Sequence, residues 1–540
     1  MSGPDRRSLP VLPAGAGTGN DAAGTGPGAG GAVAAPSLAP GTRVAMITLG
    51  CDKNTVDSER ILGSLLGAGV AVTDSPEDAD VVVVNTCGFI EMAKQESVDT
   101  LLEAARLKED GRVRAVVGMG CLVQRYRTEL QEQMPEVDLF LGHTDAHHLV
   151  PELASRGLVE ETEVPLMERP LRFLGDGARH SAHLKISEGC DHGCAFCAIP
   201  LMRGKFRSTP IDLLVREARE LEARGTVELN IVSQDTTWYG RDWARALARG
   251  DAAAMKGVEG ETHFLGRPFQ GMPNHDGLAE RLSARDGEGP VRAGPIRMEG
   301  VGRTGALPYL LRTLLDETNI PWLRLFYMYP SGITPELVSL MAAEPRILPY
   351  LDMPLQHGSD AVLRRMRRPE RRATILEKVH ALREAVPDLA LRTTVIVGFP
   401  GETETEFEEL LELLEEVRFD HMGAFAYSEE EDTLAAEMPD QVPAAVRRER
   451  LERVMDLQRA ITLERNQDRI GTRVRVLLDE VGEEDATGRG YWQAPEVDGI
   501  IRVEGIAGVS LSSGDMVDVD IIDADEYDLV GVLTRGARHD

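Results

Sequence analysis

The sequence predicts a multidomain α/β protein: an N-terminal parallel-sheet domain, a central partial (β/α) barrel and a small C-terminal antiparallel β-barrel. Nearly continuous apolar, β-branched runs alternate with helical stretches over residues 43–165, as in a buried parallel sheet. Strand–helix units recur over residues 178–470, which favours a parallel barrel. Residues 471–538 change to short β-runs split by glycines, the pattern of a small barrel. The length of 540 residues suits three domains.

The first 42 residues are rich in Gly, Ala and Pro and lack the apolar segment of a signal peptide. We expect residues 1–42 to form a disordered tail. The chain has no run of about 18 apolar residues, so no transmembrane helix is expected.

Three cysteines in the N-terminal domain each follow a predicted strand of a Rossmann-like parallel sheet. The strands cover residues 44–49, 81–84 and 115–117, and the cysteines are Cys51, Cys87 and Cys121, each beside a glycine. Ligands of open α/β sheets bind at this carboxyl edge. A lone cysteine is more often a small buried hydrophobe. Three cysteines in equivalent positions favour a three-thiolate metal cluster instead.

The central region follows a linker broken by Pro165 and Pro170. Strand-like runs cover residues 183–187, 228–232, 323–328 and 390–397. Between them lie helical stretches, including an amphipathic surface helix in which Phe407, Leu410, Leu411, Leu414 and Val417 share one face. Active sites of (β/α) barrels gather at the carboxyl ends of the strands, so the site is expected there.

Cys190, Cys194 and Cys197 have the spacing C-x3-C-x2-C and follow the first strand of this region. Thiolates are ligands for iron–sulfur clusters and for zinc. Three thiolates leave one coordination position open for a substrate or cofactor. A zinc site with His192 as fourth ligand is the alternative. A disulfide is excluded because nothing marks the chain as secreted.

These residues resemble the radical S-adenosylmethionine (SAM) methylthiotransferase family, over roughly residues 43–538. The 35 and 33 residues that separate Cys51, Cys87 and Cys121 are similar to that family's intervals. Within it, TLGCDKNTVDSE at 48–59, NTCGFI at 85–90 and MRG at 202–204 resemble the RimO branch. The tRNA-modifying MiaB branch tends to Gly-Cys-Gln-Met-Asn at the first of these motifs.

The resemblance implies two 4Fe–4S clusters. Cys190, Cys194 and Cys197 would be the catalytic cysteines, because their cluster binds SAM and cleaves it to a radical. The other three cysteines would hold an auxiliary cluster whose open iron carries the sulfur to be transferred. Two SAM molecules would serve, one to methylate that sulfur and one to give the radical. Residues implied to bind the cofactor, at the ends of the predicted barrel strands, are Gln234, Gln356, Arg392 and Glu402.

The implied product is a methylthiolated β-carbon of an aspartate in the twelfth protein of the small ribosomal subunit (S-twelve). Residues 471–538 are similar to the family's terminal TRAM domain. The formal net charge is −30, and residues 471–540 carry six Arg, no Lys and sixteen Asp plus Glu, or 6 − 16 = −10. Such a barrel would repel tRNA and attract a basic ribosomal protein, although acidity also serves solubility.

Three other interpretations stay open: a MiaB-like tRNA adenosine methylthiotransferase, a cluster protein that only carries electrons, and a zinc-stabilised binding module. Six cysteines assigned to clusters leave none for disulfides, so we expect a reducing, cytoplasmic location, a cellular electron donor and no membrane partner. The chain departs from RimO sequences in some 60 extra residues, at about 243–304, rich in Gly, Arg, Ala and Pro. We interpret them as a flexible surface insertion, with ribosome docking as the alternative.

Overall fold

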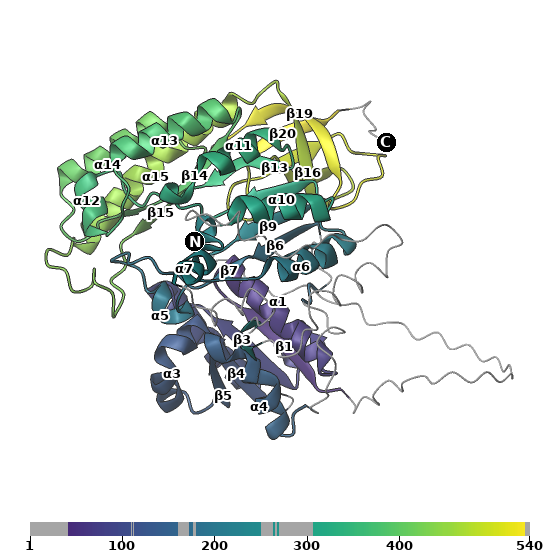
Figure 1. The fold of residues 1–540 in the computed structure, drawn as a ribbon. Helices are drawn as coiled ribbons and strands as arrows, with labels where there is room; N and C mark the ends of the chain where they lie inside the picture. Colours follow the sequence, from purple (N-terminus) through teal and green to yellow (C-terminus); the bar gives the residue numbers. More distant parts are fainter. Residues whose placement is uncertain are drawn as a thin grey trace. The chain divides into compact units, whose positions relative to one another are not determined.

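The computed structural model describes residues 41–109, 111, 113–159, 172–175, 180–249, 263–264, 267–268 and 306–534. The chain divides into two compact units, residues 1–177 (unit 1) and 178–540 (unit 2) (Figure 1). Apart from residues 41 and 42, the predicted tail lies outside the described residues, and so does most of the predicted insertion.

Unit 1 is a five-stranded parallel sheet in the order β2-β1-β3-β4-β5, which confirms the predicted parallel-sheet domain. Helices α2 and α3 pack on one face of the sheet, and α1 packs against β1 and β2 (Figure 1). The strands are β1 (Arg43–Thr48), β2 (Ala71–Thr73), β3 (Val81–Thr86), β4 (Ala115–Gly120) and β5 (Leu139–Gly142). The helices are α1 (Asp52–Gly67), α2 (Glu91–Arg106), α3 (Cys121–Gln133) and α4 (Leu149–Ser155), with 3-10 helices η1 (Pro76–Asp78) and η2 (His143–His148).

The strand order of unit 1 reverses between β1 and β3, because β2 lies on one side of β1 and β3 on the other. Every residue of β3 and β4 is buried, as expected for central strands covered on both faces. Open parallel sheets bind ligands beyond the carboxyl ends of the strands at such a reversal. Strands β1, β3 and β4 therefore present their ends at the edge where a ligand is expected.

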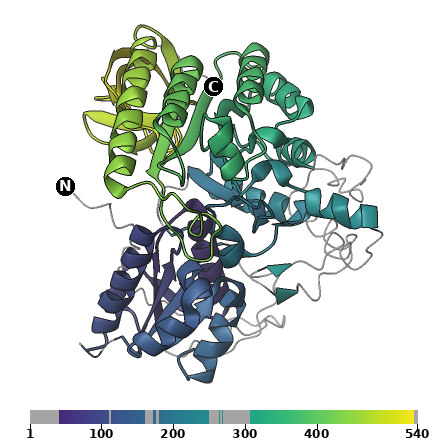
Figure 2. The same ribbon diagram turned by 90° about the vertical axis from the view of Figure 1, so that its left-hand side faces the viewer.

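Unit 2 contains a six-stranded parallel sheet in the order β15-β14-β13-β12-β9-β6, a partial barrel as predicted. Its strands are β6 (Ser181–Lys185), β9 (Glu228–Val232), β12 (Trp322–Leu325), β13 (Ile347–Asp352), β14 (Ala390–Val397) and β15 (His421–Ala426). Successive helices pack against one another along this sheet (Figure 2). They are α6 (Ile211–Ala223), α10 (Leu307–Glu317), α11 (Pro335–Ala343), α13 (Arg372–Ala385), α14 (Glu404–Val417) and α15 (Ala444–Gln467).

Shorter elements complete unit 2. They are β7 (Ser187–Glu188), α5 (Ile199–Arg203), β8 (Arg207–Ser208), η4 (Thr236–Trp238), α7 (Arg241–Arg249), β10 (His263–Phe264), β11 (Arg267–Pro268), η6 (Pro330–Gly332) and α12 (Asp360–Arg365). Helix α7 covers the first residues of the segment we interpreted as a flexible insertion. Trp243, at its start, is buried and contacts the ring of Tyr239. The chain is thus ordered further into that segment than its composition indicated.

The C-terminal part of unit 2 is a closed five-stranded barrel in the order β16-β17-β18-β20-β19. Its strands are β16 (Arg473–Val481), β17 (Asp485–Arg489), β18 (Ile501–Glu504), β19 (Met516–Ala524) and β20 (Leu529–Leu533). Four pairings are antiparallel, but β18 and β20 pair in parallel. The chain reverses twice between these two strands, through β19, so they run in the same direction. The expectation of a purely antiparallel barrel is corrected at this one pairing.

The C-terminal barrel packs on the partial barrel through an apolar cluster and a buried network of charges. Trp322 and Tyr350 of the sheet share this cluster with Trp492 of the C-terminal barrel. Fully buried Glu228 lies 2.8 Å from Arg324 of the sheet and 2.8 Å from Arg489 of the barrel. Burial alone would raise the pKa of Glu228, but Arg489 and Arg324 lower it to about 2. The carboxylate therefore joins the two parts as an anion.

We expect Glu228→Gln to destabilise the folded protein by about 3–5 kcal/mol, because two buried guanidinium groups lose their counter-charge. The pKa of Glu228 is depressed by folding, so its contribution is complete above about pH 5 and is lost as pH falls toward 2. Denaturant unfolding of both proteins between pH 7 and pH 3 checks this: the difference should shrink on acidification. Exposed Glu464, paired with Arg418, provides a control, since Glu464→Gln should cost less than about 1 kcal/mol. An equal loss of stability in both variants would contradict the assignment of Glu228 as the buried counter-ion of Arg324 and Arg489.

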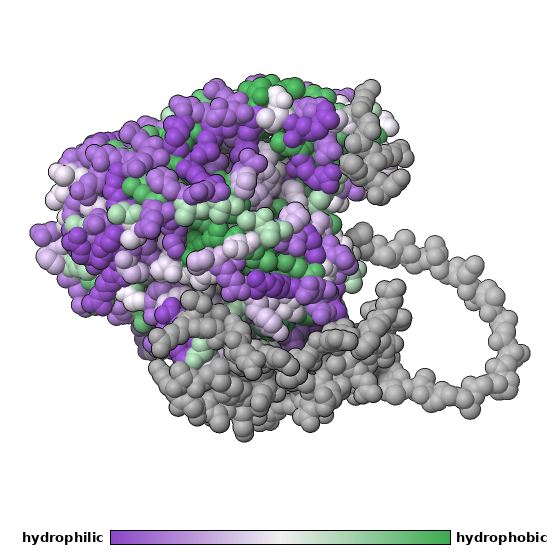
Figure 3. Space-filling model, turned by 45° about the horizontal axis from the view of Figure 1, so that its top comes forward, coloured by the Kyte–Doolittle hydropathy of each residue, from purple (hydrophilic) through white to green (hydrophobic). Residues whose placement is uncertain are grey.

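In the view of Figure 3, the coloured surface is mostly hydrophilic, and hydrophobic residues gather near the middle of the view. Exposed large apolar side chains such as Ile522, Tyr527 and Val532 of the C-terminal barrel are individually spaced along the chain. None of the described helices combines the length and the apolar composition that a membrane-spanning segment requires.

Candidate functional sites at two sets of cysteines

The cysteines of unit 1 follow β1, β3 and β4, which are neighbouring strands whose carboxyl ends meet at one edge of the sheet. Cys51 directly precedes helix α1, and Cys121 is the first residue of α3. Two of the three cysteines therefore lie at helix N-termini.

The loops that carry these cysteines are packed tightly. Gly50 has a φ of +93°, and a Cβ atom there would lie 2.9 Å from the Sγ atom of Cys87. The backbone of Cys87 is held in turn by Ser97, whose hydroxyl accepts from its N–H at 3.0 Å and donates to its carbonyl at 2.9 Å. Glycine at position 50 therefore allows the loop after β1 to contact the Cys87 sulfur.

Asn54, in the first turn of α1, connects the loops of all three cysteines. Its amide donates to the carbonyl of Leu49 at 2.7 Å and to that of Thr86 at 3.2 Å. Its Oδ1 lies 3.8 Å from the Sγ of Cys121. Our sequence analysis did not single out this residue. The available signal was its position three residues after Cys51, where an α-helix turns its side chain back toward the N-terminus.

We expect Asn54→Ala to weaken the auxiliary metal site without unfolding the chain. The variant leaves two loop carbonyls without a side-chain donor, so the three thiols are held less firmly. After anaerobic reconstitution, iron content should fall from about eight toward about four per chain, with the remaining iron on the other set of cysteines. A matched control is Asn466→Ala, which removes a buried asparagine of unit 2 that donates to the carbonyl of Asp525. Full iron content in Asn54→Ala would contradict this role.

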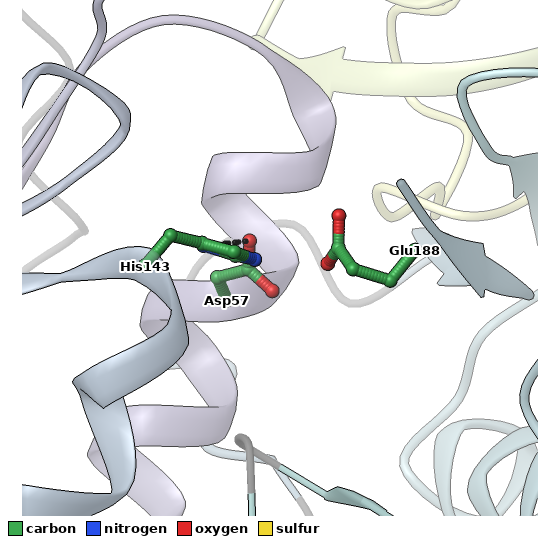
Figure 4. A group of neighbouring side chains, drawn as sticks. All are labelled: Asp57, His143 and Glu188. Atoms are coloured by element: carbon green, nitrogen blue, oxygen red, sulfur yellow. Dashed lines mark ion pairs between the residues drawn. The ribbon is translucent and has the colours of Figure 1, made fainter. Parts of the chain in front are cut away.

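A fourth strand of unit 1 also contributes to this edge. His143 follows β5 directly, and its Nδ1 lies 3.8 Å from a carboxylate oxygen of Asp57, a buried residue of α1. Figure 4 shows the two side chains facing each other. The sequence analysis did not predict this pair, because it joins residues 86 positions apart that only the parallel sheet brings together.

In unit 2, the loop that carries Cys190, Cys194 and Cys197 follows β6 and β7 and is fixed by backbone hydrogen bonds. Cys190 N donates to Gly204 O at 3.0 Å, Cys197 N to Cys194 O at 3.2 Å, and Ala195 N to Met366 O at 3.0 Å. Burial, with a smaller contribution from Cys194, raises the pKa of the Cys190 and Cys197 thiols to about 12. A cationic metal centre would supply the charge that these sulfurs need to become thiolates.

His192, the fourth ligand of the zinc alternative, already has partners. Its Nε2 lies 2.6 Å from a carboxylate oxygen of Asp235. Its ring stacks on Tyr329 at 4.0 Å between centroids and lies 3.8 Å from the ring of Trp238. The imidazole therefore forms part of the wall of the site, and the described geometry favours a three-thiolate centre over zinc bound through this nitrogen.

The residues expected to bind the cofactor fall into two groups. Gln234 follows β9, and its Oε1 is buried without a hydrogen-bond partner among the described residues. Thr236 Oγ1, two residues on, is also buried without one. Gln356 follows β13 with a φ of +77° and bridges to Val395. Buried polar atoms usually have a hydrogen-bond partner. Gln234 and Thr236 therefore fit a site in which a polar ligand supplies the missing hydrogen bonds.

The other two predicted residues are engaged in ion pairs within unit 2. Arg392 lies near the start of β14, not at its end, and contacts Asp352 at 3.2 Å and Asp498 of the C-terminal barrel at 3.1 Å. Glu402 lies 2.9 Å from Arg450 and 3.3 Å from His357. Arg392 thus belongs to the junction with the C-terminal barrel, because β14 begins only two residues before it.

Family models match three parts of the chain. The uncharacterized protein family UPF0004 matches residues 43–142, the radical SAM superfamily residues 184–414, and the TRAM domain residues 470–533. The first match covers the parallel sheet of unit 1, the second covers the partial barrel except its last strand, β15, and the third covers the closed barrel.

Known proteins of one family match most of the chain. Ribosomal protein uS12 methylthiotransferase RimO of Anaeromyxobacter sp. (strain K) is 44% identical over 498 residues, which cover 91% of this chain and 93% of that protein. The chain belongs to the RimO family. RimO of Symbiobacterium thermophilum is 41% identical over 505 residues, with 91% of each chain covered. RimO of Geobacter sulfurreducens is 39% identical over 510 residues, covering 91% of this chain and 98% of that protein. The predicted resemblance to the RimO branch is confirmed.

Solved structures with similar folds include two radical SAM enzymes. The methyltransferase TsrM from Kitasatospora setae, with cobalamin and a [4Fe-4S] cluster bound, is 14% identical with a TM-score of 0.42, covering 72% of this chain and 75% of that chain. The cobalamin-dependent enzyme OxsB is 10% identical with a TM-score of 0.45, covering 78% of this chain and 56% of that chain. Likenesses of this degree add nothing to the family assignment.

Proposed function

We propose that this RimO-family protein methylthiolates the β-carbon of an aspartate in ribosomal protein uS12, the substrate named for its relatives, using SAM and two [4Fe-4S] clusters. One observation carries the proposal. Each of two separate parallel sheets has three cysteines in the loops that follow its strands, which is the number of thiolates that leaves one iron of a [4Fe-4S] cluster open. These cysteines are Cys51, Cys87 and Cys121 in unit 1, and Cys190, Cys194 and Cys197 in unit 2.

The clusters and SAM supply the radical chemistry that activates an otherwise inert C–H bond and the sulfur that is transferred. The chain's own residues bind and orient these groups and shield them from solvent. Gln234 and Gln356, at the carboxyl ends of β9 and β13, are our candidates for contacts to SAM. Tyr329 and Trp238 hold the His192 ring beside the cysteine loop. Arg392 and Glu402 remain proposed cofactor contacts, and in the structure their side chains form ion pairs with Asp352 and Asp498 and with Arg450 and His357.

The direct test offers both candidate substrates to one enzyme sample. Anaerobically reconstituted protein is incubated with SAM, a reductant, purified small ribosomal subunits and bulk tRNA. Mass spectrometry should show an aspartate of uS12 in which a methylthio group replaces one hydrogen. Modification of a tRNA adenosine, with uS12 unchanged, would overturn the proposal in favour of the MiaB-like alternative.

We also propose that the partner is uS12, free or within the small subunit, that a cellular electron donor is needed, and that the reaction takes place in the cytoplasm. The charge of the C-terminal barrel supports a basic protein partner over tRNA. Its acidic residues are not equivalent, however. Asp518 and Asp520 of β19 pair with Arg475 and Arg473 of β16 at 3.3 and 2.8 Å. The uncompensated acidic charge must therefore come from other positions.

Glu483 and Glu484, in the turn between β16 and β17, are exposed and pair with no cation among the described residues. We expect Glu483→Lys with Glu484→Lys to slow association with uS12 on the order of two- to tenfold at low salt, because exposed charges act mainly on the association rate. The effect should fade as added salt shortens the electrostatic screening length to roughly 8 Å.

Stopped-flow or surface-binding kinetics at several salt concentrations measures this effect. Glu449→Lys with Glu452→Lys on α15 makes the same change in net charge at another exposed site and serves as the control. If both double variants slow association equally, the C-terminal barrel has no special part in recognition.

A further inference from the structure

Arg368 is a buried arginine that contacts one of the catalytic cysteines. It follows helix α12, and only 4% of its surface is exposed. One terminal nitrogen, Nη1, lies 3.9 Å from the Sγ of Cys194, and the other, Nη2, donates to the carbonyl of Pro354 at 2.8 Å. The guanidinium is therefore oriented with one N–H edge toward a sulfur that the proposed cluster would use.

Two further contacts fix this guanidinium from other directions. The ring of Tyr329 lies beneath it, 3.8 Å from its central carbon, and a carboxylate oxygen of Glu370 lies 3.3 Å from Nε. Glu370 is itself 5% exposed. The charges of the pair form a buried dipole whose positive end is at Cys194 and whose negative end points away from it.

A buried cation at the sulfur of a metal centre favours whichever redox state carries more negative charge. Reduction of a cluster adds one electron and no proton, so the whole extra charge must be stabilised by the surroundings. Arginine stays protonated in proteins, so its charge is constant through the reaction. Little water reaches this site to screen it, and the interaction is stronger than on the surface.

We propose that Arg368 raises the reduction potential of the cluster held by Cys190, Cys194 and Cys197, and that Glu370 limits this effect. The inference rests on the proposed function, since it requires that cluster. Arg368 acts through Cys194, so it is a tuning residue. Its role is to make the first electron transfer, from an external reductant, easier for this centre.

The experiment uses the full chain with Cys51, Cys87 and Cys121 changed to Ala, so that a single cluster remains. Iron and sulfide are counted first, and the midpoint potential is then measured by an anaerobic redox titration followed by electron paramagnetic resonance. Arg368→Gln should shift the potential to a more negative value, and Glu370→Gln should shift it to a more positive one. Arg368→Lys, which keeps the charge, should lie between Arg368→Gln and the unmodified residue.

Arg372→Gln is the matched control, because Arg372 pairs with Glu416 on the surface and should leave the potential unchanged. A general loosening of the loop would move Arg368→Gln and Glu370→Gln in the same direction, and that result would overturn the proposal. Unchanged potentials with full iron content would also overturn it. Absence of any cluster in the parent protein would refute the proposed function itself, a result distinguishable from either.

Discussion

Replacing Cys190, Cys194 and Cys197 together with Ala should abolish SAM cleavage and lower the iron content from about eight to about four per chain. The three thiols are the only cysteine thiols in the described part of unit 2. Replacing all three leaves no thiolate ligand at this loop, so no partial thiolate site should survive the substitution. Iron and sulfide analysis and a 5′-deoxyadenosine assay measure the two effects.

The complementary triple variant, in which Cys51, Cys87 and Cys121 become Ala, is the control for this experiment. It removes the same number of thiols and should retain about four irons and SAM cleavage. Zinc in the unmodified protein, or only about four irons per chain, would contradict the two-cluster proposal. SAM cleavage that survives the loss of Cys190, Cys194 and Cys197 would do the same.

The architecture was predictable where local pattern and tertiary environment agree. Residues 81–84 are four consecutive valines, and they form the buried strand β3. The run at 390–397 is strand β14 with the predicted bounds. The valines of β3 are all buried, as expected for a central parallel strand covered on two faces, whereas burial in β14 largely alternates along the strand. The cysteines could be assigned to the carboxyl edge because they follow such runs directly.

Contacts between distant residues could not be predicted in this way. Arg368 and Cys194 are 174 positions apart, and only the order of the strands in unit 2 brings them together. Arg392 was predicted as a cofactor contact because the resemblance implies such contacts among the polar groups that end the strands of the barrel. Its pairing with Asp498 depends on where the C-terminal barrel packs, which no local pattern specifies.

The charge of the C-terminal barrel shows the same limit. A count of acidic residues treats all of them as surface charge, yet Asp498 is buried against Arg392 and Tyr350. Asp479 lies 2.7 Å from Arg489 and 2.8 Å from His180. These acids hold unit 2 together and contribute little to an external field. The acidic surface available to a partner is therefore smaller than the net charge indicates, and more local.

Replacing Cys51, Cys87 and Cys121 with Ala should abolish methylthiolation of uS12 while 5′-deoxyadenosine still forms. These thiols lie on the sheet of unit 1, and the loop that carries the other three cysteines lies in unit 2. The second loop keeps its backbone hydrogen bonds to Gly204 and Met366, so its chemistry should not depend on the first set of cysteines.

Mass spectrometry of uS12 and quantification of 5′-deoxyadenosine from the same reaction separate the two activities. Asn54→Ala should show an intermediate version of the same phenotype, because its side chain orders the loops of these cysteines without binding metal through a thiolate. Rescue of product by added sulfide in Asn54→Ala, but not in the triple variant, would place the defect in sulfur loading. If the triple variant still methylthiolated uS12, unit 1 could not be the source of the transferred sulfur, and its cysteines would need another explanation.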